Sequence, residues 1–117
     1  MQYLLLIYAN ERDEGALDPA AMAAIMQEYQ EFTKSIVQAG QMKAADRLKP
    51  TSSASTVRLR NGKVVTTDGP FAETREQLGG YYLVEAKHLD EALAIAARIP
   101  SAKYGSVEVR PIWPAMG

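Results

Sequence analysis

The chain begins with a strand pattern that is apolar on both faces. Residues 2–8 read QYLLLIY, so four consecutive aliphatic side chains are flanked by two tyrosines. The run is too short for a typical helix, and a strand that is apolar on both sides has to be covered on both sides. Any fold for this chain must therefore place cover on each face of the sheet that contains this strand.

The first of two helix patterns follows a short polar segment. Residues 10–17 are polar and charged with one glycine, so we expect a loop there. Asp18 can cap a helix whose first turn holds Pro19, a residue with the fixed φ that this position favours. Apolar residues then recur at three- and four-residue spacing until Gly40, which supplies a C-terminal stop. This pattern predicts a long amphipathic helix.

The second helix pattern lies near the C-terminus. Apolar residues in segment 89–99 repeat with helical spacing, and Pro100 ends the pattern. His88 is the only histidine, and it stands at the predicted N-cap with Glu91 at the capping-box distance. We therefore expect His88 to have a structural role at the helix start.

Further strand patterns alternate with these helices. Asn61-Gly62 is a strong hairpin signal between two short alternating runs, at 57–60 and 63–67. The segment before this hairpin, residues 50–55, is rich in serine and turn-like. The other strands are predicted at residues 41–48, 81–86 and 107–112.

The order β-α-β-β-β-β-α-β predicts an α+β fold, a ferredoxin-like sandwich with an inserted β-hairpin. We expect one domain over residues 1–117, with both helices on one face of a mainly antiparallel sheet. The other face would be open in a monomer, and the last strand gives it Glu108 and Arg110 beside Ile112. A mixed open face and a doubly apolar first strand predict a homodimer in which two sheets pair.

The composition of the chain argues against several classes of function. The chain has 13 basic and 14 acidic residues and a net charge of -1, which provides no footprint for a phosphate backbone, so we expect no nucleic-acid partner. No apolar run reaches the roughly 18 residues of a membrane span, so we expect a cytoplasmic protein without a membrane partner. Cysteine is absent, and no phosphate loop, nucleophile elbow or histidine-based zinc pattern occurs. We expect no metal site and no cofactor.

The segment 68–76, DGPFAETRE, is the main candidate for function. Asp68 starts a glycine turn at a strand end, where partial burial can raise the pKa of a carboxylate toward that of a useful acid or base. Alternatively, Asp68 only accepts backbone hydrogen bonds within its own turn. We predict Asp68 as a catalytic residue, with the following three residues and Glu73 as ligand contacts: Gly69, Pro70 and Phe71.

Each of these contacts also has a structural interpretation. Gly69 can supply an unusual backbone dihedral angle, and its place before Pro70 favours an extended conformation. Phe71 is predicted as a core residue. Glu73 and Glu76 lie three residues apart and either bind a hard cation or form a solvated, salt-bridged turn.

Arg47, Tyr82 and Arg110 are strand residues that can face the open side of the sheet and bind a ligand there. Arginine suits bidentate capture of a carboxylate, and a tyrosine hydroxyl can fix a ligand's orientation. Alternatively, Arg110 and Glu108 neutralise each other across a subunit interface. Trp113 is predicted to anchor an interface or the C-terminal segment.

The segment 68–76 resembles the signature of the DGPFAETKE proteins, a branch of the YCII-related superfamily, with Arg75 where lysine is usual. The resemblance continues through residues 77–82, 99–100 and 107–111. It implies a dimeric α+β barrel, in which two subunits close their open faces against each other. It implies no particular reaction, because members of the family largely lack an assigned activity.

Two functions are open at this point. The first is a small-molecule enzyme or binding protein, with the ligand in a dimer cleft and Asp68 as acid or base. The second is a non-catalytic regulatory or ligand-sensing module, since relatives are often encoded beside extracytoplasmic-function sigma factors. Parts of the superfamily pair a histidine near the first strand with the aspartate of this turn. Residues 2–18 contain no histidine here, so that pair does not carry over.

Overall fold

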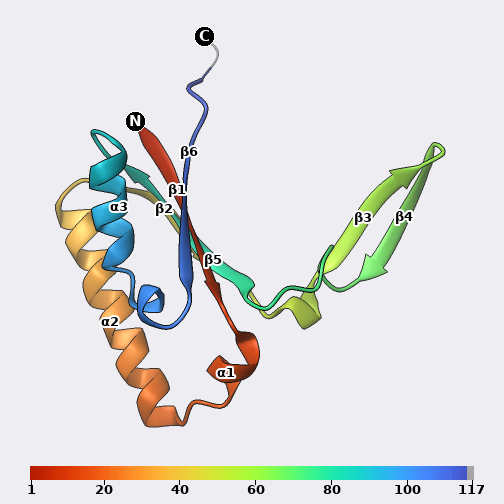
Figure 1. Cartoon of the computed structure of the whole chain (residues 1–117), viewed down its shortest axis with the longest axis horizontal. Helices are drawn as coiled ribbons and strands as arrows, with labels where there is room; N and C mark the ends of the chain where they lie inside the picture. The colour runs from red at the N-terminus through yellow and green to blue at the C-terminus, as the bar shows by residue number, and fades with distance from the viewer. Residues whose placement is uncertain (116–117) are drawn as a thin grey trace.

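The computed structural model describes residues 1–115 and shows an α+β structure with antiparallel sheets (Figure 1). Residues 116 and 117, the end of the expected domain, lie outside the described residues. The strand order β2-β5-β1-β6, with every neighbouring pair antiparallel, is compatible with a ferredoxin-like fold. These strands are β1 (Gln2–Ala9), β2 (Met42–Arg47), β5 (Gln77–Glu85) and β6 (Ser106–Pro111).

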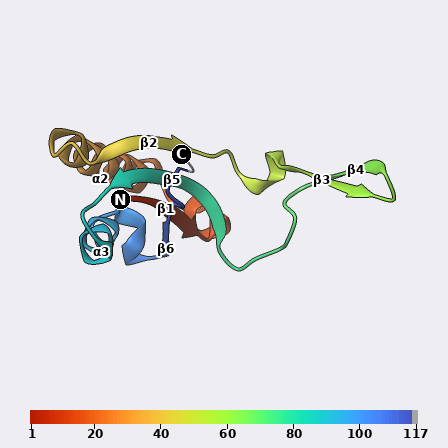
Figure 2. The same cartoon turned by 90° about the horizontal axis from the view of Figure 1, so that it is seen from above.

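The core lies between this sheet and two helices on one of its faces, α2 (Pro19–Gln38) and α3 (Leu89–Ala97) (Figures 1 and 2). Strand β1 contributes Tyr3, Leu5 and Ile7 to the core, all of them buried. The alternate residues of β1, Leu4 and Leu6, point to the other face and are only half-buried. The first strand is therefore apolar on both faces as expected, but its own chain covers only the helix side fully.

The predicted helix caps are present. The backbone N–H of Ala21 donates to Asp18 Oδ1 at 2.7 Å at the start of α2, and Gly40, just after this helix, has a φ of 71°. At the start of α3, the backbone N–H of Glu91 donates to His88 Nδ1 at 3.2 Å. The expectation that His88 is an N-cap is confirmed. Within residues 1–115, no helix has both the length and the apolar character needed to span a membrane.

The prediction of a loop at residues 10–17 was wrong, because this segment contains the short helix α1 (Glu11–Gly15). Asn10 caps it by accepting a hydrogen bond from the backbone N–H of Asp13 at 3.1 Å. The Glu11 carboxylate then accepts two hydrogen bonds of 2.8 Å from Thr51, one from the backbone and one from the hydroxyl. The Asn10 cap is local, but the helix has only five residues, none of them buried, and part of its support comes from this distant partner, so no apolar periodicity revealed it.

Strands β3 (Ser55–Arg60) and β4 (Lys63–Asp68) form a separate two-stranded sheet, which we call the arm (residues 55–68). The arm turns at Asn61 and Gly62, whose φ values are 53° and 73°. It extends on the side of the main sheet that faces away from α2 and α3 (Figures 1 and 2). The radius of gyration, 16.3 Å, is correspondingly large, since a compact domain of 100 residues has about 13 Å.

Two glycines permit close packing of the main strands. A Cβ atom on Gly80 would lie 2.8 Å from the backbone oxygen of Asp46 on β2, and one on Gly105 would lie 2.2 Å from the backbone oxygen of Tyr8 on β1. Gly79, in contrast, has open space around the equivalent position. Strand β5 begins at Gln77 rather than at residue 81. Gly80, which allows the close approach of β2, and its neighbour Gly79 both weaken the strand pattern in the sequence.

We predict that Gly105→Ala lowers the free energy of unfolding by about 1–3 kcal/mol, because the new methyl group would overlap a backbone oxygen that cannot rotate away. Gly79→Ala is the matched control, and its stability should stay close to wild type. Urea unfolding followed by circular dichroism measures both. Equal stabilities of the two variants would contradict the close approach at Gly105.

Candidate functional site

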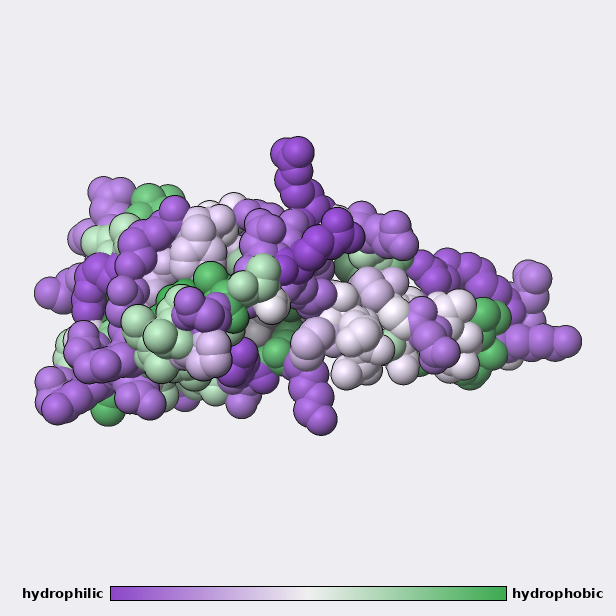
Figure 3. All heavy atoms as spheres, turned by 90° about the horizontal axis from the view of Figure 1, so that it is seen from below, coloured by the Kyte–Doolittle hydropathy of each residue, from purple (hydrophilic) through white to green (hydrophobic). Residues whose placement is uncertain are grey.

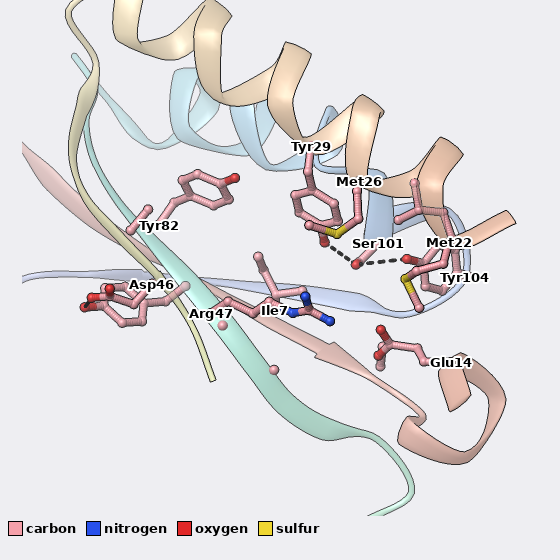
Figure 4. Close-up of a pocket in the computed structure, with 16 residues that line it drawn as sticks. Ile7, Glu14, Met22, Met26, Tyr29, Asp46, Arg47, Tyr82, Ser101 and Tyr104 are labelled. Atoms are coloured by element: carbon pink, nitrogen blue, oxygen red, sulfur yellow. Dashed lines mark hydrogen bonds between the residues drawn. The ribbon is translucent and has the colours of Figure 1, made fainter. Parts of the chain in front are cut away.

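A cavity of about 250 Å³ lies between α2 and one end of the main sheet. We call it the α2 cavity (Figure 4). Its apolar lining comes from the first half of α2, from β1 and from β2, and its polar lining comes from five elements or segments. The apolar residues are Ile7, Ala9, Met22, Ile25, Met26 and Ala45, and the principal polar side chains are Glu14, Tyr29, Arg47, Tyr82, Ser101 and Tyr104.

Three hydroxyl groups form a chain along one wall of the α2 cavity. Tyr29 from α2 is hydrogen-bonded to Ser101, and the Ser101 Oγ lies 3.4 Å from the hydroxyl oxygen of Tyr104 (Figure 4). Ser101 is 3% exposed and belongs to the 3₁₀ helix η2 (Pro100–Lys103). These hydrogen-bond contacts give the buried Ser101 hydroxyl its partners, and they link α2 to the segment after α3.

Burial raises the pKa of Tyr29 to about 12, although its hydrogen bond to Ser101 acts in the opposite direction. The phenol is therefore neutral at physiological pH. A neutral phenol can donate or accept a hydrogen bond, and here it orients the Ser101 hydroxyl at the wall of the cavity. This wall suits recognition of a polar group on a ligand better than proton removal.

Tyr82 and Arg47 both lie on the helix side of the sheet, where the α2 cavity is located. The expectation that they face the open side was wrong, because Gly80 and Tyr82 alternate onto the buried face and Gly80 pairs with Arg47. The Tyr82 hydroxyl is 2.7 Å from Thr33 Oγ1, and its ring meets the Phe32 ring edge-on with centroids 5.1 Å apart. These contacts with α2 hold Tyr82 rigidly in the floor of the cavity.

Two oppositely charged side chains, Arg47 and Glu14, line the mouth of the α2 cavity (Figure 4). Arg47 is exposed and Glu14 is half-buried. Neither belongs to any of the ion pairs within residues 1–115, which are Met1–Glu85, Lys103–Glu28 and Arg110–Glu108. A ligand entering this cavity would therefore meet a guanidinium group and a carboxylate that are both available for new interactions.

The first part of segment 68–76 forms the joint between the arm and the rest of the chain. Asp68 is exposed at the end of β4 and does not line the α2 cavity. The backbone N–H of Gly69 donates to the carbonyl oxygen of Ala54 at 2.7 Å, and the Thr56 hydroxyl donates to the Gly69 carbonyl at 2.8 Å. Gly69 has a φ of 97°, the unusual dihedral angle expected for it.

The second part of this segment is tied to the main sheet and to α1. The Ser106 hydroxyl donates to Glu76 Oε1 at 2.7 Å, and the Asn10 side chain donates to the Arg75 carbonyl at 3.1 Å. Gln77 completes these contacts, because its Nε2 donates to the carbonyl of Thr74 at 2.6 Å. Segment 68–76 therefore connects the arm to the body of the chain.

The remaining candidates lie apart from the α2 cavity. Phe71 is 79% exposed, so its expected place in the core was wrong; the residue sits on the connecting segment, beyond the reach of the helix-covered core. Pro70 and Glu73 are exposed on the same segment. Arg110 projects from β6 on the opposite face of the sheet and pairs with Glu108 of the same chain.

The structure also reveals lining residues that the sequence analysis missed. Glu14 belongs to a segment predicted as a loop, and Met26 and Tyr29 lie in the segment predicted only as an amphipathic helix. Ser101 and Tyr104 follow the predicted end of α3. A tyrosine on the apolar face of a predicted helix is the one local signal that pointed here, since a buried hydroxyl needs a partner.

Comparison with known proteins gives a family and one similar protein. The model of the YCII-related domain family matches residues 1–116. An uncharacterized protein of Rhizobium meliloti (strain 1021) is 39% identical over 114 residues, which cover 96% of this chain and 92% of that protein.

The raised pKa of Tyr29 predicts a specific loss of stability at high pH. Between about pH 10 and 12 the unfolded chain has lost this proton while the folded chain retains it, so folding is stabilised below pH 10 and the contribution is lost as the pH rises through about 12. Tyr29→Phe removes the titrating group. The fall in unfolding free energy between about pH 9 and 11, measured in urea, should therefore be smaller in Tyr29→Phe. An identical fall in both proteins would contradict the burial of this phenol.

Proposed function

The chain belongs to the YCII-related domain family, and we propose that it is a homodimeric protein that binds a small molecule in the α2 cavity. The observation that carries this proposal is a pair of charged side chains, Arg47 and Glu14, at the mouth of a cavity with a mainly apolar lining and a wall of hydroxyls; neither belongs to an ion pair within residues 1–115. Ligand sites commonly combine a mainly apolar lining with a few convergent polar groups. The α2 cavity has this composition.

The lining supports a particular kind of ligand. A volume of about 250 Å³ lies just below the usual range of drug-sized sites, roughly 300–1,000 Å³, so the ligand is compact. Methionine and isoleucine side chains suit an apolar body, and Arg47 suits a carboxylate because its guanidinium can form two parallel hydrogen bonds. We therefore propose a small carboxylate with an apolar body.

The dimer is proposed from the face of the sheet that α2 and α3 leave uncovered, which we call the open face. Leu4 and Leu6 of β1 and Leu83 of β5 are half-buried neighbours on this face, with Leu4 directly opposite Leu83. Arg110 and Glu108 neutralise each other beside them within one chain. An apolar centre with polar groups at its margin is typical of a subunit interface.

Asp68 remains the proposed acid or base for a ligand in the dimer cleft. Because Asp68 does not line the α2 cavity, this role concerns a ligand held between the two copies on the open-face side, and not the ligand of the α2 cavity. The α2 cavity and the role of Asp68 are therefore separable parts of the proposal. A ligand that binds without turnover would favour the alternative function, a ligand-sensing module.

We predict that Arg47→Gln weakens binding of benzoate or hexanoate at least tenfold, because a charged hydrogen bond contributes about 1.5–3 kcal/mol. Isothermal titration calorimetry on the full chain measures the affinities, after a thermal-shift screen has selected the better of the two probes. Benzamide and hexanamide serve as uncharged probes, and Arg47→Gln should change their binding little.

Arg75→Gln is the matched protein control, because Arg75 is also an exposed arginine outside the ion pairs but does not line the cavity. This variant should bind the carboxylate as wild type does. Equal weakening in both variants, or binding of the carboxylate that Arg47→Gln leaves unchanged, would overturn the assignment of the cavity.

We also predict that Leu6→Asp dissociates the dimer, since a charge at the centre of an apolar interface is desolvated without a partner. Sedimentation velocity should show twice the 12.8 kDa chain mass for wild type and the single chain mass for the variant. Val37→Asp is the matched control, because Val37 is a 52% exposed apolar residue on α2, on the other side of the sheet. A wild-type protein that stays monomeric at micromolar concentration would refute the dimer.

A further inference from the structure

The arm carries an apolar face that its own chain leaves uncovered. In the register of β3 and β4, Leu59 is opposite Val64, and Val57 lies two residues from Leu59 on the same face. These three side chains are 65%, 69% and 63% exposed, respectively. Figure 3 shows apolar residues gathered toward the end of the arm, at a distance from the rest of the molecule.

The apolar face of the arm needs a second surface to pack against. A two-stranded ribbon is marginally stable at best in water, and it needs packing against another layer to be well ordered. Here neither strand pairs with the main sheet. Exposed valine and leucine on one face of such a ribbon are typical of a segment that packs against a partner.

The charge of the arm limits which surface can cover it. Residues 55–68 contain three basic side chains, Arg58, Arg60 and Lys63, and one acidic side chain, Asp68, although the whole chain has a net charge of -1. The arm is therefore positive and the remainder of the chain is negative. A second copy of this chain offers the complementary charge.

The open face matches the apolar face of the arm in chemistry. Its centre contains the half-buried leucines of β1 and β5 described above. Around this centre stand Asp46, which accepts a hydrogen bond from the Tyr81 hydroxyl, and two acidic residues in ion pairs: Glu108 with Arg110, and Glu85 with the N-terminal ammonium group. Arg58, Arg60 and Lys63 lie on the opposite face of the arm, the face of Val65, so the apolar face can pack on this apolar strip while the basic side chains stay in water.

The position of the arm permits an exchange between two copies. The arm and the open face lie on the same side of the molecule, opposite α2 and α3 (Figures 1 and 2). A second copy whose open face approaches from this side comes within reach of the arm, and by two-fold symmetry it presents its own arm in return. One closed dimer then covers both arms.

We propose that the arm of each copy packs its apolar face, Val57, Leu59 and Val64, on the open face of the second copy, with its basic side chains on the outer face that remains in water. This inference rests on the proposed homodimer and adds the element that holds it together. The joint at Gly69, fixed by its hydrogen bonds to Ala54 and Thr56, sets the direction in which the arm extends.

Interchain disulfide formation tests this contact directly, because the natural chain has no cysteine. Leu59→Cys in one tagged full-length chain is mixed with a differently tagged chain that carries Leu4→Cys, Leu6→Cys, Tyr81→Cys or Leu83→Cys. A disulfide requires Cα atoms within about 7 Å, so we expect mild oxidation to yield the heterodimer with at least one of these four acceptors. Val65→Cys is the matched control, since Val65 lies on the opposite face of the arm, and it should yield at least tenfold less.

A second measurement removes the apolar face and keeps the strand propensity. The full-length triple variant Val57→Thr, Leu59→Thr and Val64→Thr retains β-branched residues suited to strands and should raise the dimer dissociation constant at least tenfold. Val65→Thr should leave that constant unchanged. Sedimentation equilibrium measures both variants, and circular dichroism confirms that they are folded.

The outcomes separate this inference from the proposed function. If wild type is a dimer but Leu59→Cys forms no heterodimer with any acceptor, or no more than Val65→Cys does, the arm contact is wrong while the dimer stands. An unchanged dissociation constant in the triple variant likewise overturns the arm contact alone. If wild type is a monomer, both the dimer and the arm contact fail, whereas ligand binding in the α2 cavity is unaffected.

Discussion

The demand for cover on both faces of β1 is the constraint on which the rest of this structure depends. On the helix side, Leu5 is fully buried beneath α2 and α3, and this burial places the core. Because the run 2–8 is apolar on both faces, the opposite side of β1 also has to be covered. There, Leu4 and Leu6 are only half-buried by their own chain. The α2 cavity lies at one end of the covered side, and the proposed dimer satisfies the uncovered side. Site and assembly thus use different faces of one strand.

The segment 68–76 stands out in the sequence, yet it contributes no residue to the α2 cavity. Its first residues form the joint of the arm, where Gly69 needs a positive φ, and its last residues are tied to the body through Glu76 and Ser106. A motif that stands out in a sequence can therefore direct the path of the backbone without supplying a residue to the cavity. In this structure the segment sets where the arm extends, and the side chains available to a ligand come from α1, α2, β1, β2, β5 and the segment after α3.

Local patterns predicted those features that depend on neighbouring residues. The caps at Asp18 and His88 could be predicted because each side chain bonds a backbone N–H three residues away. The turn at Asn61-Gly62 has the positive φ values that such a pair favours. Helix α1 also has a local cap at Asn10, but it was missed because it is only five residues long, buries no residue and is held at Glu11 by the distant Thr51. The exposure of Phe71 was missed because the identity of an aromatic residue does not show whether it lies within reach of the core.

The sequence by itself determined the strands, the two long helices, the positions of their caps and the family, because these follow from residues that lie close together in the chain. Only the tertiary structure decided that Tyr29, Arg47 and Ser101 surround one cavity and that Tyr82 faces the helices. Whether these side chains meet depends on strand register, because a shift of one residue moves every side chain of the strand to the opposite face of the sheet. Here the register of β1 against β5 shifts between Ile7 and Tyr8, at the end of the sheet where the cavity forms. A sequence pattern of period two specifies which residues share a face, while the packing of the helices decides which of the two faces becomes the inside.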